Sequence, residues 1–221
     1  IGTAEMFAGW EGQGGLKGKL KLDVPSAKGE KPKVVVDFDT SNARLKIAAP
    51  VIELNQLKGA FRFDYDKGLS GQNISARVFD KPMTAQIFAE GKPGEMQTRV
   101  EAKGQVALTA LTQWLQVKQA LPLSGELPYQ LQLSLGSRDN QLKVDSSLKG
   151  LAINLPAPFG KTAEETRNSQ FSMTLQGDER RFVLSYADVA NMVYAASMDK
   201  LDQGRGELMF GSGSAQLPSS Q

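Results

Sequence analysis

Two neighbouring carboxylates are the most direct candidates for acid–base chemistry in this chain. Asp37 and Asp39 are two positions apart, so both side chains would point to the same face of a β-strand. Paired carboxylates can act as general acid and base, for example on a glycosidic bond. These two alternate with Val36 and Phe38, which favours a solvated strand face. A carbohydrate-processing β-enzyme that uses them is kept as an alternative.

Two other motifs have only part of the pattern that their chemistry needs. Gly160-Lys161-Thr162 matches the end of a phosphate-binding loop, but the glycine required five positions before Gly160 is replaced by Leu155. Ser146 and Lys149 have the Ser-x-x-Lys spacing without its companion motifs, in a segment with strand periodicity. The chain has no histidine and no cysteine, which excludes Ser-His-Asp and Cys-His couples and Cys/His zinc sites. We therefore expect no catalytic residues, no metal ligands and no cofactor.

Composition indicates a globular protein without a membrane helix or a nucleic-acid partner. Of 221 residues, 40% are hydrophobic and 23% charged, and the net charge is +2. No window reaches the roughly 20 apolar residues of a membrane-spanning helix. Lys17, Lys19 and Lys21 would share one strand face, which we interpret as solvated because no aromatic residue lies among them. The Gly- and Ser-rich residues 211–221 predict a disordered tail.

Alternation of apolar and polar residues dominates the chain and predicts β-strands. It is clear in Leu16–Val24, Val34–Phe38, Leu57–Tyr65, Met83–Ala89, Met96–Val106, Tyr129–Leu135, Leu142–Leu148, Phe171–Leu175, Phe182–Tyr186 and Met192–Ala196. Turn residues separate the strands at Ser41-Asn42, Asp66-Lys67-Gly68, Lys92-Pro93-Gly94, Ser137–Asn140, Gly177-Asp178 and Asp202-Gln203-Gly204. This spacing predicts consecutive antiparallel hairpins.

Helix is scarce in the pattern. Leu108, Leu111 and Leu115 have helical spacing, and Thr162 with Glu165 has the spacing of a capping box, which predicts a second short helix. Pro156 and Pro158 predict an ordered loop over Leu155–Thr162, because proline removes a backbone donor and restricts the residue before it. The fold class is therefore mainly β, with one or two short helices.

The number of strands raises the question of what covers their apolar face. We count roughly 14 strands, whereas open twisted sheets rarely exceed about 10 without curling or splitting. The apolar face could be covered by a second sheet, closed into a barrel, or curved around something else. The sequence pattern leaves these three possibilities open.

Several segments resemble one family, the YhdP-like proteins of the bacterial AsmA-like superfamily. The resemblance spans Leu57 to Phe210, and its most specific part is the Leu-Pro-Ala-Pro-Phe-Gly-Lys segment that begins at Leu155. It is carried by Leu57–Asp64, Gly68–Phe79, Trp114-Leu115 before Leu123-Ser124-Gly125, Ser146–Leu151 and Leu155–Thr162.

The resemblance implies the function that we expect. Such proteins are long, periplasmic and anchored in the inner membrane by an N-terminal helix, and they are thought to conduct phospholipids toward the outer membrane in an extended β-groove. Residues 1–221 would be a single groove segment inside such a protein, a strongly curved antiparallel sheet without enzymatic activity. Its partners would be phospholipid acyl chains, neighbouring segments of the same chain and the membrane anchor.

The residues expected to line this groove are the larger apolar ones of the alternating strands. They are Phe61, Phe63, Tyr65, Val100, Tyr129, Leu131, Leu133, Leu142 and Val144. We expect them to share one concave surface, because a sheet with one solvated face has one apolar face. The alternative is a closed β-sandwich or barrel that acts as a scaffold or adaptor.

Overall fold

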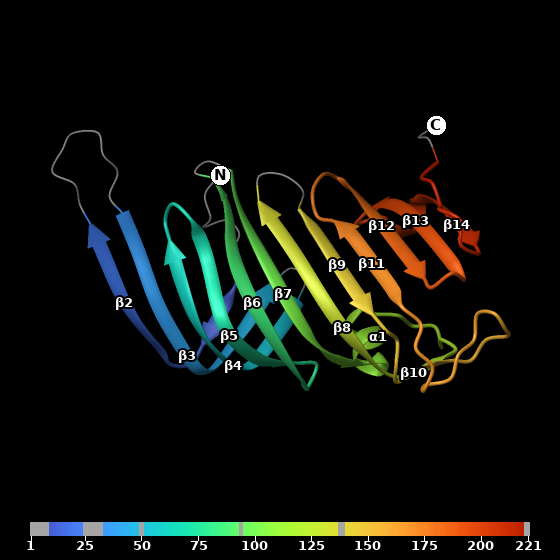
Figure 1. The fold of residues 1–221 in the computed structure, drawn as a ribbon, viewed down its shortest axis with the longest axis horizontal. Helices are drawn as coiled ribbons and strands as arrows, with labels where there is room; N and C mark the ends of the chain where they lie inside the picture. Colours follow the sequence, from blue (N-terminus) through green and yellow to red (C-terminus); the bar gives the residue numbers. More distant parts are fainter. Residues whose placement is uncertain (1–8, 24–32, 49–50, 93–94, 137–139, 219–221) are drawn as a thin grey trace. The chain divides into compact units, whose positions relative to one another are not determined.

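The computed structural model describes residues 9–23, 33–48, 51–92, 95–136 and 140–218, and it is almost entirely antiparallel β-structure (Figure 1). The strands are β1 (Glu11–Gln13), β2 (Leu16–Asp23), β3 (Lys33–Ala48), β4 (Val51–Asp64), β5 (Gly68–Val78), β6 (Lys81–Lys92), β7 (Glu95–Ala107), β8 (Leu123–Gly136), β9 (Gln141–Ser146), β10 (Leu151–Ile153), β11 (Ser169–Thr174), β12 (Glu179–Tyr186), β13 (Ala190–Ser197) and β14 (Arg205–Phe210). Helix α1 (Leu108–Trp114) and a short 3₁₀ turn (Leu201–Gln203) are the described helical elements.

The strands follow one hydrogen-bonded order that is open at both ends. The order is β1-β3-β4-β5-β6-β7-β8-β9-β11-β12-β13-β14, with β2 also paired to β3 and β10 to β8. This confirms the predicted fold class of a mainly β, antiparallel, open sheet, and it is not the closed barrel of the alternative. The chain divides into two compact units, residues 1–102 and 103–221, and each is described separately below.

In the first unit, β2 to β6 place most of their apolar residues on one face. Phe38 lies opposite Phe61 across β3 and β4, and their rings stack with centroids 5.1 Å apart. The small buried cluster of this face consists of Leu57, Ile74 and Ala76, with Phe61 and Met83 among its half-buried neighbours. The face is apolar because strand alternation puts every second residue there.

The predicted turn at Ser41-Asn42 is wrong, because β3 runs through both residues without reversing. The pairing of β3 with β4 shifts register between Thr40 and Ala43, which is the signature of a β-bulge. A bulge accommodates the polar Ser-Asn pair inside a long strand, so a local turn signal was overruled by strand pairing. Some residues of other predictions lie outside the described residues: Pro93 and Gly94 of the predicted turn that begins at Lys92, Val24, and residues 137–139 of the predicted turn Ser137–Asn140.

In the second unit, β8, β9 and β11 to β14 form a continuous antiparallel series. β10 leaves this order and pairs instead with the first residues of β8, Leu151 opposite Gly125 and Ile153 opposite Leu123. Residues 148–168, which contain β10, form a lobe beside the sheet and are called the lobe from here on. Helix α1 precedes β8, as predicted from the leucine spacing.

The lobe confirms one prediction and overturns another. Leu155–Thr162 is a loop, with a turn in which the Phe159 N–H donates to the Pro156 carbonyl over 2.9 Å. No helix begins at Thr162 in this described segment, although its backbone N–H donates to a Glu165 carboxylate oxygen over 2.8 Å. The Glu165 hydrogen bond of the capping box therefore forms without a helix. The backbone carbonyls of Thr162 and Ala163 instead accept hydrogen bonds from Lys161 and from the Gly150 N–H within the lobe.

The described part of the C-terminal segment returns over β13 and β14. Asn191 donates through Nδ2 to the carbonyl oxygens of Gly211 and Gly213, over 3.2 and 2.7 Å. Arg205 donates through Nε to the Pro218 carbonyl over 3.1 Å. The disordered tail predicted over 211–221 includes residues 219–221, which lie outside the described residues.

Candidate functional site

Three rows of residues make up one face of the second unit, which we call the apolar face. Directly opposite partners in an antiparallel sheet point to the same side, so the strand register defines each row. Row one is Leu133, Leu142, Met173, Phe182, Tyr194 and Gly206. Row two is Leu131, Val144, Phe171, Leu184, Met192 and Leu208. Row three is Ser146, Ser169, Tyr186, Ala190 and Phe210, continued on β8 by Tyr129.

Rows one and two carry almost only apolar side chains. Their aromatic members contact one another across strands: the ring centroids of Phe171 and Phe182 are 6.5 Å apart, and those of Phe182 and Tyr194 are 6.3 Å apart. Spacings of this order are typical of favourable aromatic pairs. The two rows therefore form a coherent hydrophobic surface across six strands.

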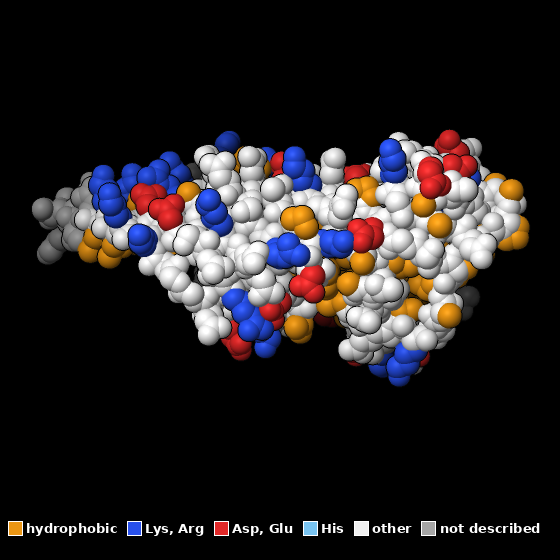
Figure 2. Space-filling view, turned by 90° about the horizontal axis from the view of Figure 1, so that it is seen from below, with side chains coloured by type: hydrophobic (Ala, Val, Ile, Leu, Met, Phe, Trp, Pro, Cys, Tyr) orange, Lys and Arg blue, Asp and Glu red, His pale blue; other side chains and the backbone are white. Residues whose placement is uncertain are grey.

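This surface remains accessible in the described structure. Every side chain of rows one and two is half-buried or exposed, and Leu208 retains 54% of its accessible surface. Figure 2 shows hydrophobic side chains gathered in a recess on the part of the molecule that carries β8 to β14. A sealed sandwich core would instead bury such residues almost completely.

The opposite face of the same strands is polar near β8, β9 and β11. Gln132 lies opposite Lys143, and Gln130 opposite Asp145. Gln170 donates to the Asp145 carboxylate over 2.8 Å. Farther along, Val193 and Ala195 are buried on this face, where the C-terminal segment returns over β13 and β14. At β8, β9 and β11 the sheet thus separates a hydrophilic side from a hydrophobic one, as the alternating sequence predicts.

The lobe meets the apolar face at row three. The Tyr186 hydroxyl donates to the Phe159 carbonyl over 2.9 Å, and the Phe159 ring packs edge-on against Phe210 with centroids 5.3 Å apart. Arg167 donates through Nη1 to the Pro158 carbonyl over 2.6 Å and to the Tyr186 hydroxyl over 3.0 Å. The lobe therefore borders the hydrophobic rows with polar backbone and one cation.

Lys161 organises the lobe from inside. Its side chain is buried, and Nζ donates to the carbonyl oxygens of Leu148 (2.9 Å), Leu151 and Thr162 (2.6 Å). Burial lowers the pKa of Lys161, while Glu165 acts in the opposite direction. Lys161 thus binds backbone carbonyls in a site unlike a phosphate-binding loop.

Most residues predicted to line the groove lie on hydrophobic faces of their own unit. Leu133 and Leu142 are the first two members of row one, and Leu131 and Val144 the first two of row two, with Tyr129 on the same face of β8. Burial raises the pKa of Tyr129. In the first unit, Phe61 and Phe63 share one face.

The two other predicted residues, Tyr65 and Val100, also belong to the first unit. Tyr65 follows the end of β4 and is 61% exposed, and Val100 is half-buried on β7. Whether all nine predicted residues share one surface stays a prediction. Sequence reasoning missed the later members of the rows, although their alternation was visible, and it missed Arg167 and Phe159, which have no periodic signal.

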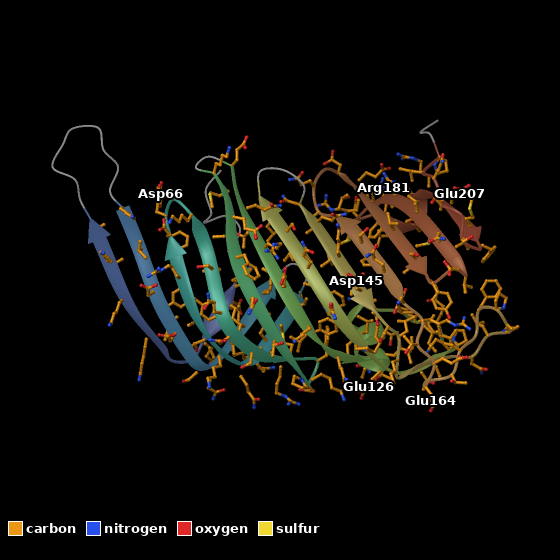
Figure 3. All side chains as sticks on the ribbon, viewed as in Figure 1. Asp66, Glu126, Asp145, Glu164, Arg181 and Glu207 are labelled. Carbon is orange, nitrogen blue, oxygen red and sulfur yellow. The ribbon has the colours of Figure 1, made fainter. Side chains whose placement is uncertain are left out.

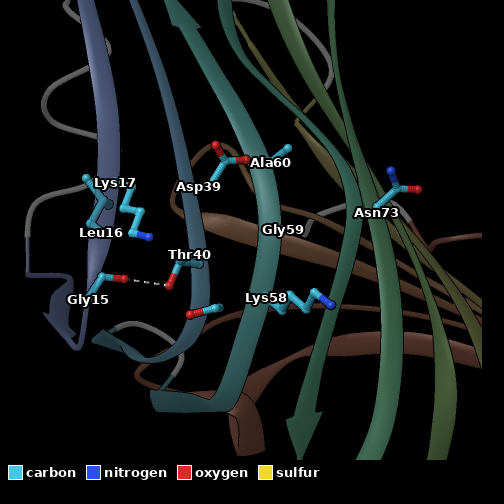
Figure 4. A pocket seen from close by; sticks show the side chains of 10 residues that line it. Gly15, Leu16, Lys17, Asp39, Thr40, Lys58, Gly59, Ala60 and Asn73 are labelled. Carbon is cyan, nitrogen blue, oxygen red and sulfur yellow. Dashed lines mark hydrogen bonds between the residues drawn. The ribbon is translucent and has the colours of Figure 1, made fainter.

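The first unit also has a hollow on its polar side, at the bulge of β3 (Figure 4). Its volume is about 590 Å³, and Lys17, Asp39 and Lys58 are among the side chains that line it. Thr40 and Gly15 also line it, and Thr40 donates through Oγ1 to the Gly15 carbonyl over 3.1 Å. Leu16, Gly59 and Ala60 also line it, so the hollow combines charged side chains with apolar surface and has no continuous row of large apolar side chains like rows one and two.

The carboxylates that could have supported enzymatic chemistry lie on this polar side. Asp37 accepts two hydrogen bonds from Arg62, one from Nε over 2.6 Å and one from Nη2 over 3.0 Å. The Arg62 guanidinium lowers the pKa of Asp37, with a smaller contribution from Lys19. A carboxyl group that acts as a general acid needs a raised pKa, whereas the pKa of Asp37 is lowered.

Comparison with known families decides the relationship that the sequence suggested. Residues 2–221 match the family described as YhdP protein. The chain belongs to the YhdP family. No curated protein and no solved structure matches it. Within the described part of this YhdP family member, α1 and the 3₁₀ turn are both too short to cross a bilayer.

Proposed function

We propose that this chain is a segment of a periplasmic bridge whose apolar β-face conducts phospholipids between the inner and outer membranes. The observation that carries the proposal is the accessibility of rows one and two. Six strands present nearly uniform apolar side chains on one side, and those side chains remain half-buried or exposed. Membership of the YhdP family supports the same assignment.

The physical need for such a surface follows from lipid solubility. Exposing a methylene to water costs about 0.8 kcal/mol, so a chain of about 16 carbons costs roughly 13 kcal/mol to transfer. A continuous hydrophobic surface lowers this barrier without any bond being made or broken. The segment would therefore act through solvation alone and not as an enzyme.

The alternative function, a scaffold domain with a closed core, requires that the apolar residues be buried. A scaffold domain gains stability by burying its apolar residues, and exposed hydrophobic patches of this extent usually mark a binding surface. Leu184 and Leu208 on row two are exposed, and so is Phe210 on row three. Acyl chains are suitable partners for such a surface because they need no directional hydrogen bonds.

The proposal also includes a cellular location and neighbouring parts of the same polypeptide. We assign the chain to the periplasm as part of an inner-membrane-anchored envelope protein. Neighbouring segments of the same polypeptide would continue the path on either side. Neither a cofactor nor a nucleic acid has a role in this mechanism.

Site-specific photo-crosslinking in living cells tests the proposal. A photoreactive phenylalanine analogue replaces Leu133 on row one or, as matched control, Gln132, which directly precedes it and points to the opposite face of β8. We expect phospholipid adducts at position 133 and none at position 132, detected by mass spectrometry of the purified protein. Equal labelling at both positions, or none at 133 in a folded protein, contradicts lipid conduction along this face.

A further inference from the structure

We propose that Arg167 is a headgroup-binding residue that holds the phosphate of a phospholipid whose acyl chains lie on rows one and two. This inference rests on the proposed function and names the place where the polar end of the lipid binds. It starts from the different chemistry of row three, which borders rows one and two along the same face.

Row three is the hydroxyl-bearing edge of the apolar face. Tyr129, Ser146, Ser169 and Tyr186 lie along it on four different strands. The two serines are engaged with the backbone: Ser146 donates to the Pro128 carbonyl over 2.5 Å and Ser169 to the Ser185 carbonyl over 2.7 Å. On β8, β9, β11 and β12 the surface therefore changes from apolar side chains at rows one and two to hydroxyl-bearing ones at row three, whereas β13 and β14 continue row three with Ala190 and Phe210. The change on the first four strands matches an amphiphile with its chains on rows one and two.

Arg167 is the cation at this edge. Its guanidinium carbon lies 5.6 Å from the centroid of the Tyr186 ring, so the charge lies on the side of the sheet that carries the apolar face. Both acceptors of Nη1 are uncharged oxygens, the Pro158 carbonyl and the Tyr186 hydroxyl. In the described part of the chain, Nε and Nη2 have no protein acceptor. A guanidinium with free N–H groups is suited to bind a phosphate through paired hydrogen bonds.

Both the side chain and the backbone of Arg167 are held in place before any ligand binds. The hydrogen bonds of Nη1 to Pro158 and Tyr186 fix the guanidinium. The Arg167 backbone N–H donates to the Ser147 carbonyl over 2.9 Å, and Lys161 secures the rest of the lobe through three carbonyls. Preorganisation of this kind reduces the entropy lost on binding.

The acidic residues of the lobe lie close in sequence but do not pair with Arg167. Glu165 accepts the Thr162 N–H, and Glu164 is exposed (Figure 3). The other cation of the lobe interior, Lys161, is occupied by carbonyl oxygens. Arg167 is therefore the group at this edge that offers a positive charge to a ligand.

Binding of two lipids with identical acyl chains tests the inference with the full chain. Dioleoyl phosphatidylglycerol carries a phosphate and dioleoylglycerol does not, so the ratio of their dissociation constants reports the headgroup contact alone. We expect the chain to bind the phospholipid about tenfold more tightly, as a charge-assisted contact at a half-exposed site predicts. Arg167→Gln should abolish this preference while leaving dioleoylglycerol binding unchanged, and Arg167→Lys, which keeps the charge but loses the paired hydrogen bonds, should retain only part of it.

Arg181→Gln is the matched control, because Arg181 (labelled in Figure 3) is on β12 like Tyr186 but lies five positions from it and so points to the opposite face. It should leave the binding of both lipids unchanged, and thermal unfolding should show that all variants are folded. An unchanged preference in Arg167→Gln overturns the headgroup assignment while lipid binding stands. Failure of the wild type to bind either lipid overturns the proposed function itself. Binding of inorganic phosphate as tight as that of the phospholipid would show a free-anion site and also overturn the assignment.

Discussion

Lys161 donates a hydrogen bond from Nζ to the carbonyl oxygen of Leu148, 2.9 Å away and 13 positions earlier in the chain. Both residues are buried, with 6% and 8% of their surface accessible. An ammonium group in such a place needs acceptors, because an unpaired buried charge is strongly unfavourable. The carbonyls of Leu151 and Thr162 supply the others. The lobe is thus built around one cation.

Replacement of this cation should destabilise the second unit. Lys161→Met keeps the length of the side chain but leaves carbonyls without their donor, so we expect the free energy of unfolding to fall by about 2–4 kcal/mol. Chemical denaturation measures it. Lys149→Met, at an exposed lysine of the same lobe, is the control and should change stability by less than about 0.5 kcal/mol. A similar small effect for Lys161→Met would show that the carbonyls do not depend on the ammonium.

The pH dependence of stability should report the same group. Because burial lowers the pKa of Lys161 in the folded protein, the unfolded chain binds more protons between that value and 10.5. Unfolding free energy therefore rises with pH across this interval. The difference between wild type and Lys161→Met isolates the effect, since other groups titrate alike in both proteins. A difference that is constant with pH contradicts the lowered pKa.

Gly71 should resist substitution because two side chains occupy the space beside it. A Cβ atom at this position would lie 2.9 Å from Cδ1 of Ile74 and 3.0 Å from Cδ1 of Phe61. We expect Gly71→Ala to reduce the free energy of unfolding by about 1–3 kcal/mol through overpacking. Gly12→Ala is the control, because an added Cβ there meets no atom within 4 Å. Equal unfolding midpoints for the two variants would contradict the tight packing around Phe61.

A charge on row one should affect lipid passage more than folding. Leu133→Asp places a carboxylate against the acyl chains, where an unpaired polar group costs roughly 2–7 kcal/mol, while the empty surface lets water reach it. We expect near-normal abundance of the full-length protein with severely reduced lipid supply to the outer membrane. Phe63→Asp tests the face of the first unit in the same way, and Gln132→Asp on the polar face is the control.

The two readouts of this experiment separate the alternatives. Normal lipid supply with a stable Leu133→Asp protein contradicts conduction at that position. Loss of the folded protein instead indicates a closed core, because a buried unpaired charge destabilises the native state.

The sequence alone determined which residues share a side within each strand. Alternation is a local property of extended backbone, so Leu131 and Leu133, or Phe61 and Phe63, had to point the same way once those segments were strands. Leucine spacing determined α1, and two prolines determined the loop over 155–162. These inferences needed no knowledge of what lies beside each segment.

Tertiary structure decided the pairing of strands and therefore the rows. β9 pairs with β11 because β10 turns away to β8, which brings Val144 beside Phe171. It also brought Arg167 to Tyr186 and Phe159 to Phe210, contacts between segments far apart in sequence. Alternation has the same period in every strand and so cannot specify register or partner. Long-range packing supplies that information, and it also stopped Thr162 from starting a helix and carried β3 through Ser41 without a turn.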